Sequence, residues 1–455
     1  MSPAQTPSEI SISAAARIPE EGLAATDVLA ALEDCRQHDA DWRNARTWSL
    51  VYHAEDSILD LVKEAHSRYF CENALNPLAF PSLKRLENEV VQMTAQMLNA
   101  PDTAAGTMTS GGSESLLMAF KTAREWARAH HPAIHEPEVL LPVTAHPAML
   151  KAAHYFGLRA VHVPVDAGFR ASAGAAANLI TDRTILVIAS APAYPHGVID
   201  PVSDLAALAS QHGILCHVDA CLGGFLLPWV EKLGRPLPPF DFRVPGVTSM
   251  SADIHKYGFA AKGASVVLYR TRELRRHQFF TYPDWPGGLY GSPSMAGTRP
   301  GGAIAAAWSV MCHLGEAGYL RLARVTLETT EALIAGVRAI PGLYILGEPD
   351  MSVFAFAADD LDVYLLADAM EVRGWKLDRQ QRPPSLHVMV TPNHASIVAP
   401  FLADLRECAA ELAGTHPAPE SAAAMYGMLG AVPGRDQVDA FILDFMDSLD
   451  APGVR

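Results

Sequence analysis

The fold is decided by residues 184–219, TILVIASAPAYPHGVIDPVSDLAALASQHGILCHVD, in which two apolar runs flank a helical pattern. We expect strands at Thr184–Ala189 and Ile214–Val218, because short runs rich in valine, isoleucine and leucine are typical of buried strands. Between them, Pro201–His212 has helical periodicity and ends before Gly213. A strand, a helix and a second strand in this order predict a parallel sheet that helices cover on both faces.

The same alternation continues on both sides of this unit. Further strands are expected at Val139–Val143, Ala160–Val165, Val247–Met250 and Ser265–Tyr269, and further helices at Ser115–His130 and Pro147–Phe156. The Gly- and Pro-rich residues 281–302 predict a long irregular loop, followed by a helix at 303–338 and short strands near 344–346, 352–357 and 385–390. We therefore predict an α/β protein in three parts. These are an N-terminal segment with a flexible tip and helices at 1–90, a large domain with a mostly parallel sheet at 91–310, and a small α+β C-terminal domain at 311–455.

Composition narrows the classes of function. The chain has 455 residues, 49% of them hydrophobic and 19% charged, which excludes wholesale disorder. Its net charge of −15 comes without a basic stripe, so we expect no nucleic-acid partner. The most apolar helical stretch, 303–312, is about half the ~20 residues that a bilayer requires, so we expect no membrane span. Six scattered cysteines without CxxC spacing and no signal peptide predict a cytoplasmic protein without a zinc site.

Three short motifs carry chemistry. The first is TSGGSES at 109–115, which contains Gly112 and Ser113 and lies immediately before the helix expected at Ser115–His130. Two glycines let backbone N–H groups approach an anion, and the helix start adds free N–H groups and a positive dipole end, so the motif favours phosphate binding. The alternative is an ordinary helix cap in a turn.

The second and third motifs follow strands. Asp219 ends an apolar strand, where a carboxylate is costly to bury without a cationic partner, and a protonated pyridine nitrogen would be such a partner. His217 lies on the same face of that strand, and we expect it to bind the same cofactor as Asp219. Lys256, beside His255 in SADIHKYG, could form a Schiff base. Singly, these residues also fit a structural aspartate and a surface lysine. Together with the phosphate motif they predict pyridoxal 5'-phosphate as the cofactor.

At this point the sequence resembles the sphingosine-1-phosphate lyases, in the decarboxylase-like branch of the fold-type I (aspartate-aminotransferase-like) pyridoxal-phosphate enzymes. The resemblance covers most of the chain beyond about residue 45. Its motifs are SGGSES at 110–115, HVDACLGGF at 217–225, SADIHKYGFAAKGASVVLY at 251–269 and DWPGGLYGSPSMAGTRPG at 284–301.

The resemblance implies a role for each matching residue. Lys256 would carry the cofactor, Asp219 would pair with its ring nitrogen, and His146 would stack on its ring. Gly112, Ser113 and His255 would contact the phosphate, and Tyr194 would be an active-site tyrosine. The resemblance also implies a homodimer with shared active sites, in which Gly297 and Thr298 reach the cofactor of the neighbouring subunit. Tyr52, Asn76 and Lys262 match residues of the substrate-binding region.

One departure concerns the substrate. Relatives carry a histidine in a segment that here reads NPLAFPS at 76–82, with Ala79 in its place. Either other groups, such as Arg299, replace this contact to the substrate's phosphate, or the substrate is a different one. The resemblance implies retro-aldol cleavage of a phosphorylated long-chain sphingoid base to a fatty aldehyde and phosphoethanolamine. The alternatives are an amino-acid decarboxylase of the same branch and a catalytically silent binding protein. His130, His131 and His135 are not expected to form a metal site, because prolines follow them at a helix end.

Overall fold

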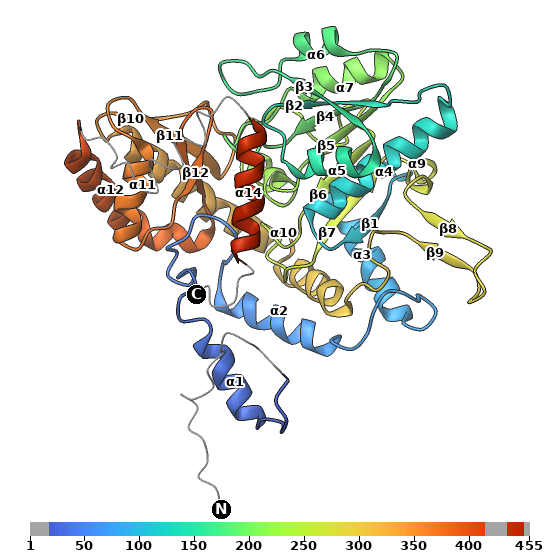
Figure 1. Ribbon diagram of the computed structural model, residues 1–455, viewed down its shortest axis with the longest axis horizontal. Helices are drawn as coiled ribbons and strands as arrows, with labels where there is room; N and C mark the ends of the chain where they lie inside the picture. The colour runs from blue at the N-terminus through green and yellow to red at the C-terminus, as the bar shows by residue number, and fades with distance from the viewer. Residues whose placement is uncertain (1–17, 415–434, 450–455) are drawn as a thin grey trace, which may run out of the picture.

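The computed structural model describes residues 18–414 and 435–449, in which two sheets of different size lie side by side (Figure 1). The N-terminal tip that we predicted to be flexible falls mostly within residues 1–17, outside the described residues. The helices have the following bounds: α1 Ala25–Asp34, α2 Asp56–Arg68, α3 Pro81–Met97, α4 Gly112–His130, α5 Ala148–Phe156, α6 Ala173–Leu179, α7 Val202–Gln211, α8 Leu227–Lys232, α9 Arg272–Arg276, α10 Gly301–Arg338, α11 Val363–Val372, α12 Val398–Leu412 and α14 Arg435–Leu449.

The larger sheet has seven strands in the described part of the chain, in the order β1-β7-β6-β5-β4-β2-β3. Their bounds are β1 Ala105–Thr109, β2 Glu138–Pro142, β3 Arg159–Val163, β4 Thr184–Ser190, β5 Leu215–Asp219, β6 Ser249–Ala252 and β7 Ser265–Tyr269. The pairs β3–β2, β2–β4, β4–β5 and β5–β6 are parallel, whereas β7 runs antiparallel to both β6 and β1. The predicted α/β fold with a mostly parallel sheet is therefore confirmed.

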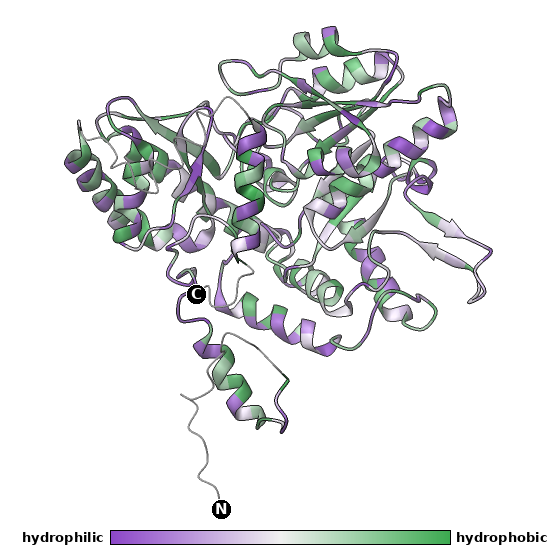
Figure 2. Cartoon of the chain, viewed as in Figure 1, coloured by the Kyte–Doolittle hydropathy of each residue, from purple (hydrophilic) through white to green (hydrophobic). Residues whose placement is uncertain are grey.

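Apolar side chains that alternate along the strands cover both faces of this sheet. On β4, Val187 and Ala189 pack with α7 in the largest buried cluster, whereas Leu186 and Ile188 pack with α4 and α5 in a separate one. Figure 2 shows these strands in hydrophobic colour. Because both faces are buried, the strands read as continuous apolar runs, which is what made them recognisable in the sequence.

The second sheet is antiparallel, with the order β10-β11-β13-β12. Its strands are β10 Leu343–Ile345, β11 Val353–Ala358, β12 Asp378–Gln380 and β13 Ser385–Met389. Its core contains Phe354 and Phe356 of β11, and also Trp48 from the N-terminal segment, whose ring stacks on His394 at 4.5 Å. The N-terminal segment is thus part of the smaller core, and α10 passes through the predicted boundary at residue 310. The three-part division stays a prediction.

The loop predicted at 281–302 is not wholly irregular. Two strands, β8 Phe280–Tyr282 and β9 Tyr290–Ser292, form an antiparallel hairpin that projects from the large sheet (Figure 1). Each strand has only three residues, too few to show an alternating pattern in the sequence. No helix among the described residues is long and apolar enough for a bilayer crossing.

Candidate active site

The carboxyl ends of β4, β5 and β6 meet at one edge of the large sheet, where a cavity of 510 Å³ opens. Ligands in parallel α/β sheets bind at this edge. Nine of the residues predicted for the site lie in the cavity wall: Tyr52, Gly112, Ser113, His146, Tyr194, Asp219, His255, Lys256 and Lys262. Segments from across the sequence therefore converge on one site.

The start of α4 forms one end of the cavity. No side chain caps this helix, so its first N–H groups are free for an anion. A Cβ atom at Gly112 would lie 2.7 Å from Asp253 Oδ2 and 2.8 Å from Cys221 Sγ, so there is no room for a side chain. Glu114 fixes the turn, because its carboxylate accepts hydrogen bonds from the backbone N–H groups of Ser110 at 2.6 Å and Met295 at 2.8 Å.

Asp219, the last residue of β5, is buried and held by two donors. Its Oδ1 accepts hydrogen bonds from the backbone N–H of Cys221 at 3.0 Å and from the Ser251 hydroxyl at 3.3 Å. Ser251 is in turn 3.3 Å from Nε2 of His217, whose Nδ1 lies 2.8 Å from the Ser249 hydroxyl. Ser251 is a supporting residue that the sequence did not single out.

His217, predicted to bind the cofactor, lies outside the cavity wall and contacts serines instead. The reason is geometric: the cavity lies beyond the end of β5, and His217 is two residues back along the strand from Asp219. Burial lowers the pKa of His217 to about 4, so its ring is neutral near pH 7. Its visible role is to support Ser251, and through it Asp219.

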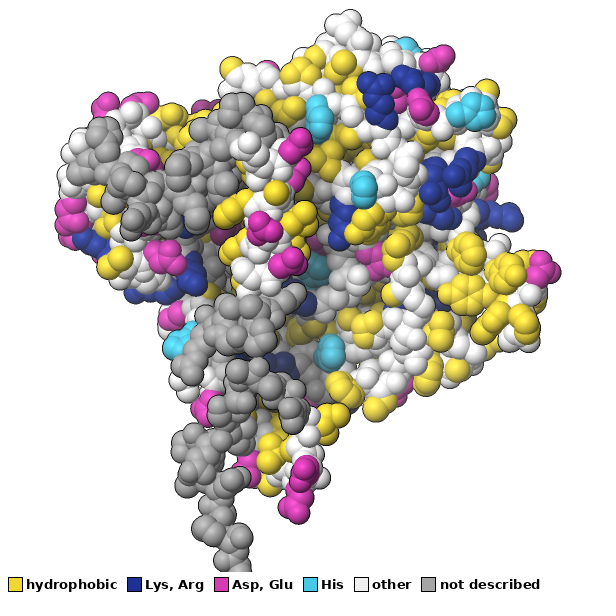
Figure 3. Space-filling view, in the orientation of Figure 1, with side chains coloured by type: hydrophobic (Ala, Val, Ile, Leu, Met, Phe, Trp, Pro, Cys, Tyr) yellow, Lys and Arg dark blue, Asp and Glu magenta, His cyan; other side chains and the backbone are white. Residues whose placement is uncertain are grey.

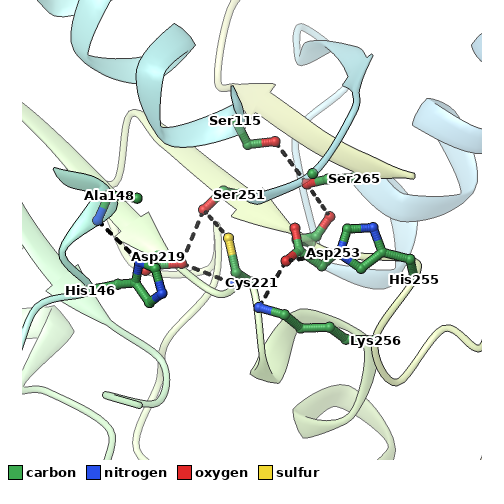
Figure 4. Close-up of polar contacts among 12 residues, drawn as sticks. Ser115, His146, Ala148, Asp219, Cys221, Ser251, Asp253, His255, Lys256 and Ser265 are labelled. Atoms are coloured by element: carbon green, nitrogen blue, oxygen red, sulfur yellow. Dashed lines mark hydrogen bonds and ion pairs between the residues drawn. The ribbon is translucent and has the colours of Figure 1, made fainter. Parts of the chain in front are cut away.

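Lys256 follows β6 and forms an ion pair inside the site. Its Nζ lies 2.9 Å from Oδ2 of Asp253, a carboxylate only 1% exposed (Figure 4). Burial alone would lower the pKa of Lys256, but the charge and hydrogen bond of Asp253, together with Cys221 and Asp219, outweigh it and the pKa is raised. Burial alone would raise the pKa of Asp253, but Lys256 and His255 outweigh it and the pKa is lowered. Both partners are therefore charged. Sequence reasoning assigned no role to Asp253.

His146 and Tyr194 form the side of the cavity near Asp219. Nδ1 of His146 accepts the backbone N–H of Ala148 at 3.2 Å, so a neutral ring carries its proton on Nε2. Burial lowers the pKa of His146, and Asp219 offsets part of this effect. The Tyr194 hydroxyl donates to Asp378 at 3.5 Å. Burial and then Asp378 raise the pKa of Tyr194 to about 12, so the hydroxyl keeps its proton at neutral pH.

At the other side of the cavity, Lys262 and Tyr52 lie together. Nζ of Lys262 donates to the backbone oxygen of Leu50 at 2.7 Å and lies 5.0 Å from the centre of the Tyr52 ring. Burial and then the charge of Lys256 lower the pKa of Lys262. The Tyr52 hydroxyl contacts Sδ of Met389 at 2.8 Å. This pair offers an ammonium and a hydroxyl to an anionic substrate group.

Besides His217, three predicted residues do not line this cavity: Asn76, Gly297 and Thr298. Asn76 is exposed in a turn, where its Oδ1 accepts the backbone N–H of Leu78 at 3.0 Å. Arg299, considered as a replacement for the missing histidine, is wrong for that role. Its guanidinium is buried against Glu87, at 2.5 Å, and does not reach the cavity.

The wall fits pyridoxal phosphate on chemical grounds. Free N–H groups at Gly112 and Ser113 suit the phosphate, the buried Asp219 suits a protonated ring nitrogen, and Lys256 supplies the amine. His146 lies in the same wall. A Cβ at Gly112 would clash with Asp253 and Cys221, so the turn packs directly on these two side chains and only glycine fits there.

Comparison with known proteins gives the following similarities. Residues 32–359 match the family described as the pyridoxal-dependent decarboxylase conserved domain. The sphingosine-1-phosphate lyase of Arabidopsis thaliana is 43% identical over 95% of this chain and 80% of its own length. The solved sphingosine-1-phosphate lyase of Burkholderia pseudomallei is 37% identical, with a TM-score of 0.88 over 97% of this chain and 98% of its own. A Lactobacillus brevis glutamate decarboxylase, 20% identical with a TM-score of 0.77 over 89% and 96%, shares the fold.

Proposed function

Because this chain belongs to the sphingosine-1-phosphate lyases, within the pyridoxal-dependent decarboxylase family, we propose that it cleaves a phosphorylated long-chain sphingoid base to a fatty aldehyde and phosphoethanolamine. It is a lyase that uses pyridoxal phosphate. Two observations support this function: the chain is similar to sphingosine-1-phosphate lyases over nearly its full length, and Lys256, Asp219 and His146 lie in the wall of one cavity. The glutamate decarboxylase is too distant to support the alternative of amino-acid decarboxylation.

Bound in this cavity, pyridoxal phosphate supplies an acceptor for the electron pair left on substrate C2 when the C2–C3 bond breaks. Asp219 holds a proton on the ring nitrogen, and Ser251 and the Cys221 N–H keep its carboxylate in place. The N–H groups at the start of α4 would hold the phosphate, and the neutral ring of His146 would lie against the cofactor ring. Lys256 supplies the amine that carries the cofactor.

Proton transfer at the substrate falls to Lys256 and Tyr194. The C3 hydroxyl has to lose its proton as the C2–C3 bond breaks and the aldehyde forms. Since Tyr194 keeps its own proton at neutral pH, it is suited to donate and not to accept. Lys256, once its amine is free and neutral, is a base in the same wall. Lys262 and Tyr52 bind the substrate's phosphate.

We place this reaction in a homodimer with shared sites. Gly297 and Thr298 lie outside their own chain's cavity, which leaves them available to a neighbouring subunit. The nearby hairpin exposes four large apolar side chains, Phe280, Tyr282, Trp285 and Leu289. Figure 3 shows hydrophobic side chains gathered over this hairpin. Exposed patches of this kind mark protein interfaces. The six free cysteines support a cytoplasmic location.

The function and the assembly are tested separately. The purified enzyme is incubated with a phosphorylated sphingoid base and with amino acids, and fatty aldehyde, phosphoethanolamine and carbon dioxide are measured. Carbon dioxide without aldehyde would overturn the proposed function. For the dimer, Lys256→Ala and Thr298→Arg are each expected to be inactive alone. When equal amounts of the two variants are mixed and exchange subunits, half of the dimers contain one chain of each kind. Each mixed dimer has one intact site of two, so the mixture should regain about a quarter of the wild-type activity. No recovery in a mixture shown to exchange subunits argues against shared sites.

A further inference from the structure

Asp253 is a buried carboxylate inside the cavity to which none of the roles above is assigned. It is 1% exposed, and its Oδ2 lies 2.9 Å from Nζ of Lys256 and 3.7 Å from Nε2 of His255. Its other oxygen, Oδ1, has no hydrogen-bond partner among the described residues. A buried carboxylate is costly unless paired, so Lys256 is the partner that stabilises its charge.

The position of this carboxylate matters as much as its charge. It lies beneath the start of α4, since a Cβ at Gly112 would be 2.7 Å from Oδ2 and 3.0 Å from Oδ1. Figure 4 shows Lys256 directed toward Asp253, with Asp219 and His146 on the other side of Cys221. The amine is therefore held at the phosphate end of the cavity, away from Asp219.

We propose that Asp253 is a positioning residue that holds Lys256 as an ammonium ion beneath the phosphate-binding turn while the cofactor is absent. This inference rests on the proposed function, because it takes Lys256 as the residue that carries the cofactor. Only a neutral amine attacks an aldehyde. Asp253 therefore keeps the amine of Lys256 unreactive until a ligand bound at the start of α4 breaks the ion pair between them. An aldehyde that carries a phosphate group is such a ligand, because its phosphate binds at the start of α4.

Several titratable groups face Asp253 and bear on a pH measurement. They are Lys256 and His255 from its own loop, Cys221 after β5, Lys262 before β7 and Tyr52 from the N-terminal segment. Burial lowers the pKa of His255 to about 4, and burial raises the pKa values of Cys221 and Tyr52. These three groups therefore stay neutral between pH 7 and 9. A change in Lys256 reactivity in that range therefore does not come from the titration of these three groups.

The test measures how fast acetic anhydride acetylates Lys256 in cofactor-free protein, by quantitative mass spectrometry from pH 7 to 9. Burial lowers the pKa of Lys256 and the Asp253 carboxylate raises it. The Asp253→Asn variant lacks this carboxylate, so we expect the pKa of Lys256 to fall. One pKa unit changes the neutral fraction tenfold, so we expect acetylation at least ~10-fold faster than in the wild type. The matched control is Asp241→Asn, which removes a carboxylate of equal burial that pairs with Arg243 at 2.9 Å, away from the cavity. It should leave Lys256 unchanged.

Equal acetylation rates in folded Asp253→Asn and wild type would overturn the proposal. If Asp253→Asn does not fold, thermal unfolding of two other cofactor-free variants decides. Lys256→Met leaves Asp253 buried without its cation and should lower the melting temperature, and Lys256→Met with Asp253→Asn should recover it. A double variant no more stable than Lys256→Met would overturn the pairing. None of these measurements needs turnover, so they remain interpretable if the proposed substrate is wrong.

Discussion

Replacing Gly112 with alanine tests whether the start of α4 holds the cofactor phosphate. The new methyl group would lie 2.7 Å from Asp253 Oδ2 and 2.8 Å from Cys221 Sγ, closer than any ordinary contact, and both neighbours are buried. Overpacking of this kind costs about 1–3 kcal/mol. If the strain is relieved by moving the turn away from its phosphate-binding position, cofactor affinity falls by about 5- to 150-fold.

The assay is a fluorescence titration of cofactor-free protein with pyridoxal phosphate, with unfolding temperature measured in parallel. Gly174→Ala is the matched control, because a Cβ at that position on α6 meets nothing within 4 Å. Its dissociation constant should equal that of the wild type. If Gly112→Ala folds and binds the cofactor with wild-type affinity, the phosphate does not lie at this turn and the cofactor placement is refuted.

The remaining predictions concern the ring nitrogen, the substrate phosphate and pH. Asp219→Asn should keep the fold and lose most activity, because an amide does not hold a proton on the ring nitrogen; steady-state kinetics with normal turnover would remove Asp219 from this role. Lys262→Ala should lose about 10- to 150-fold in kcat/KM for a phosphorylated base, the effect of one charge-assisted hydrogen bond, and change little for its unphosphorylated counterpart; equal losses would refute phosphate recognition by Lys262. Burial lowers the pKa values of four histidines, His196, His217, His255 and His387, to about 4. As the pH falls below about 6.5, these histidines are protonated in the unfolded chain but not in the folded one. The free energy of unfolding is therefore at its full value above about pH 6.5 and falls toward pH 4. A melting temperature that is constant between these two pH values would contradict the lowered histidine pKa values.

Much of the fold was accessible from the sequence because its strands are buried on both faces. The runs at β4 and β5 were recognisable within one residue of their bounds. Strand β1, AGTMT, was missed because glycine and threonine interrupt its apolar pattern. Strands β8, β9 and β12 were missed. Each has three residues and none of them is buried, whereas β10, equally short but predicted, buries Leu343.

Site residues could be predicted from the sequence where a functional motif consists of a few consecutive residues. The glycines before α4, the strand-end Asp219 and Lys256 were all found in this way, and the structure brings them to one cavity. Contacts between segments that are far apart in the sequence could not be predicted. The sequence could not show that Asp253 pairs with Lys256, or that Arg299 is occupied by Glu87, because both depend on how the chain folds around them.

The measurement that tests the central claim most directly is product analysis with a phosphorylated sphingoid base labelled in its long chain, using the wild type and Lys256→Ala loaded with pyridoxal phosphate. We predict that the wild type forms fatty aldehyde and phosphoethanolamine in equal amounts, and that Lys256→Ala forms neither. Absence of aldehyde from the folded, cofactor-loaded wild type, or equal product from Lys256→Ala, would contradict the assignment of this chain as a carbon–carbon lyase acting through Lys256.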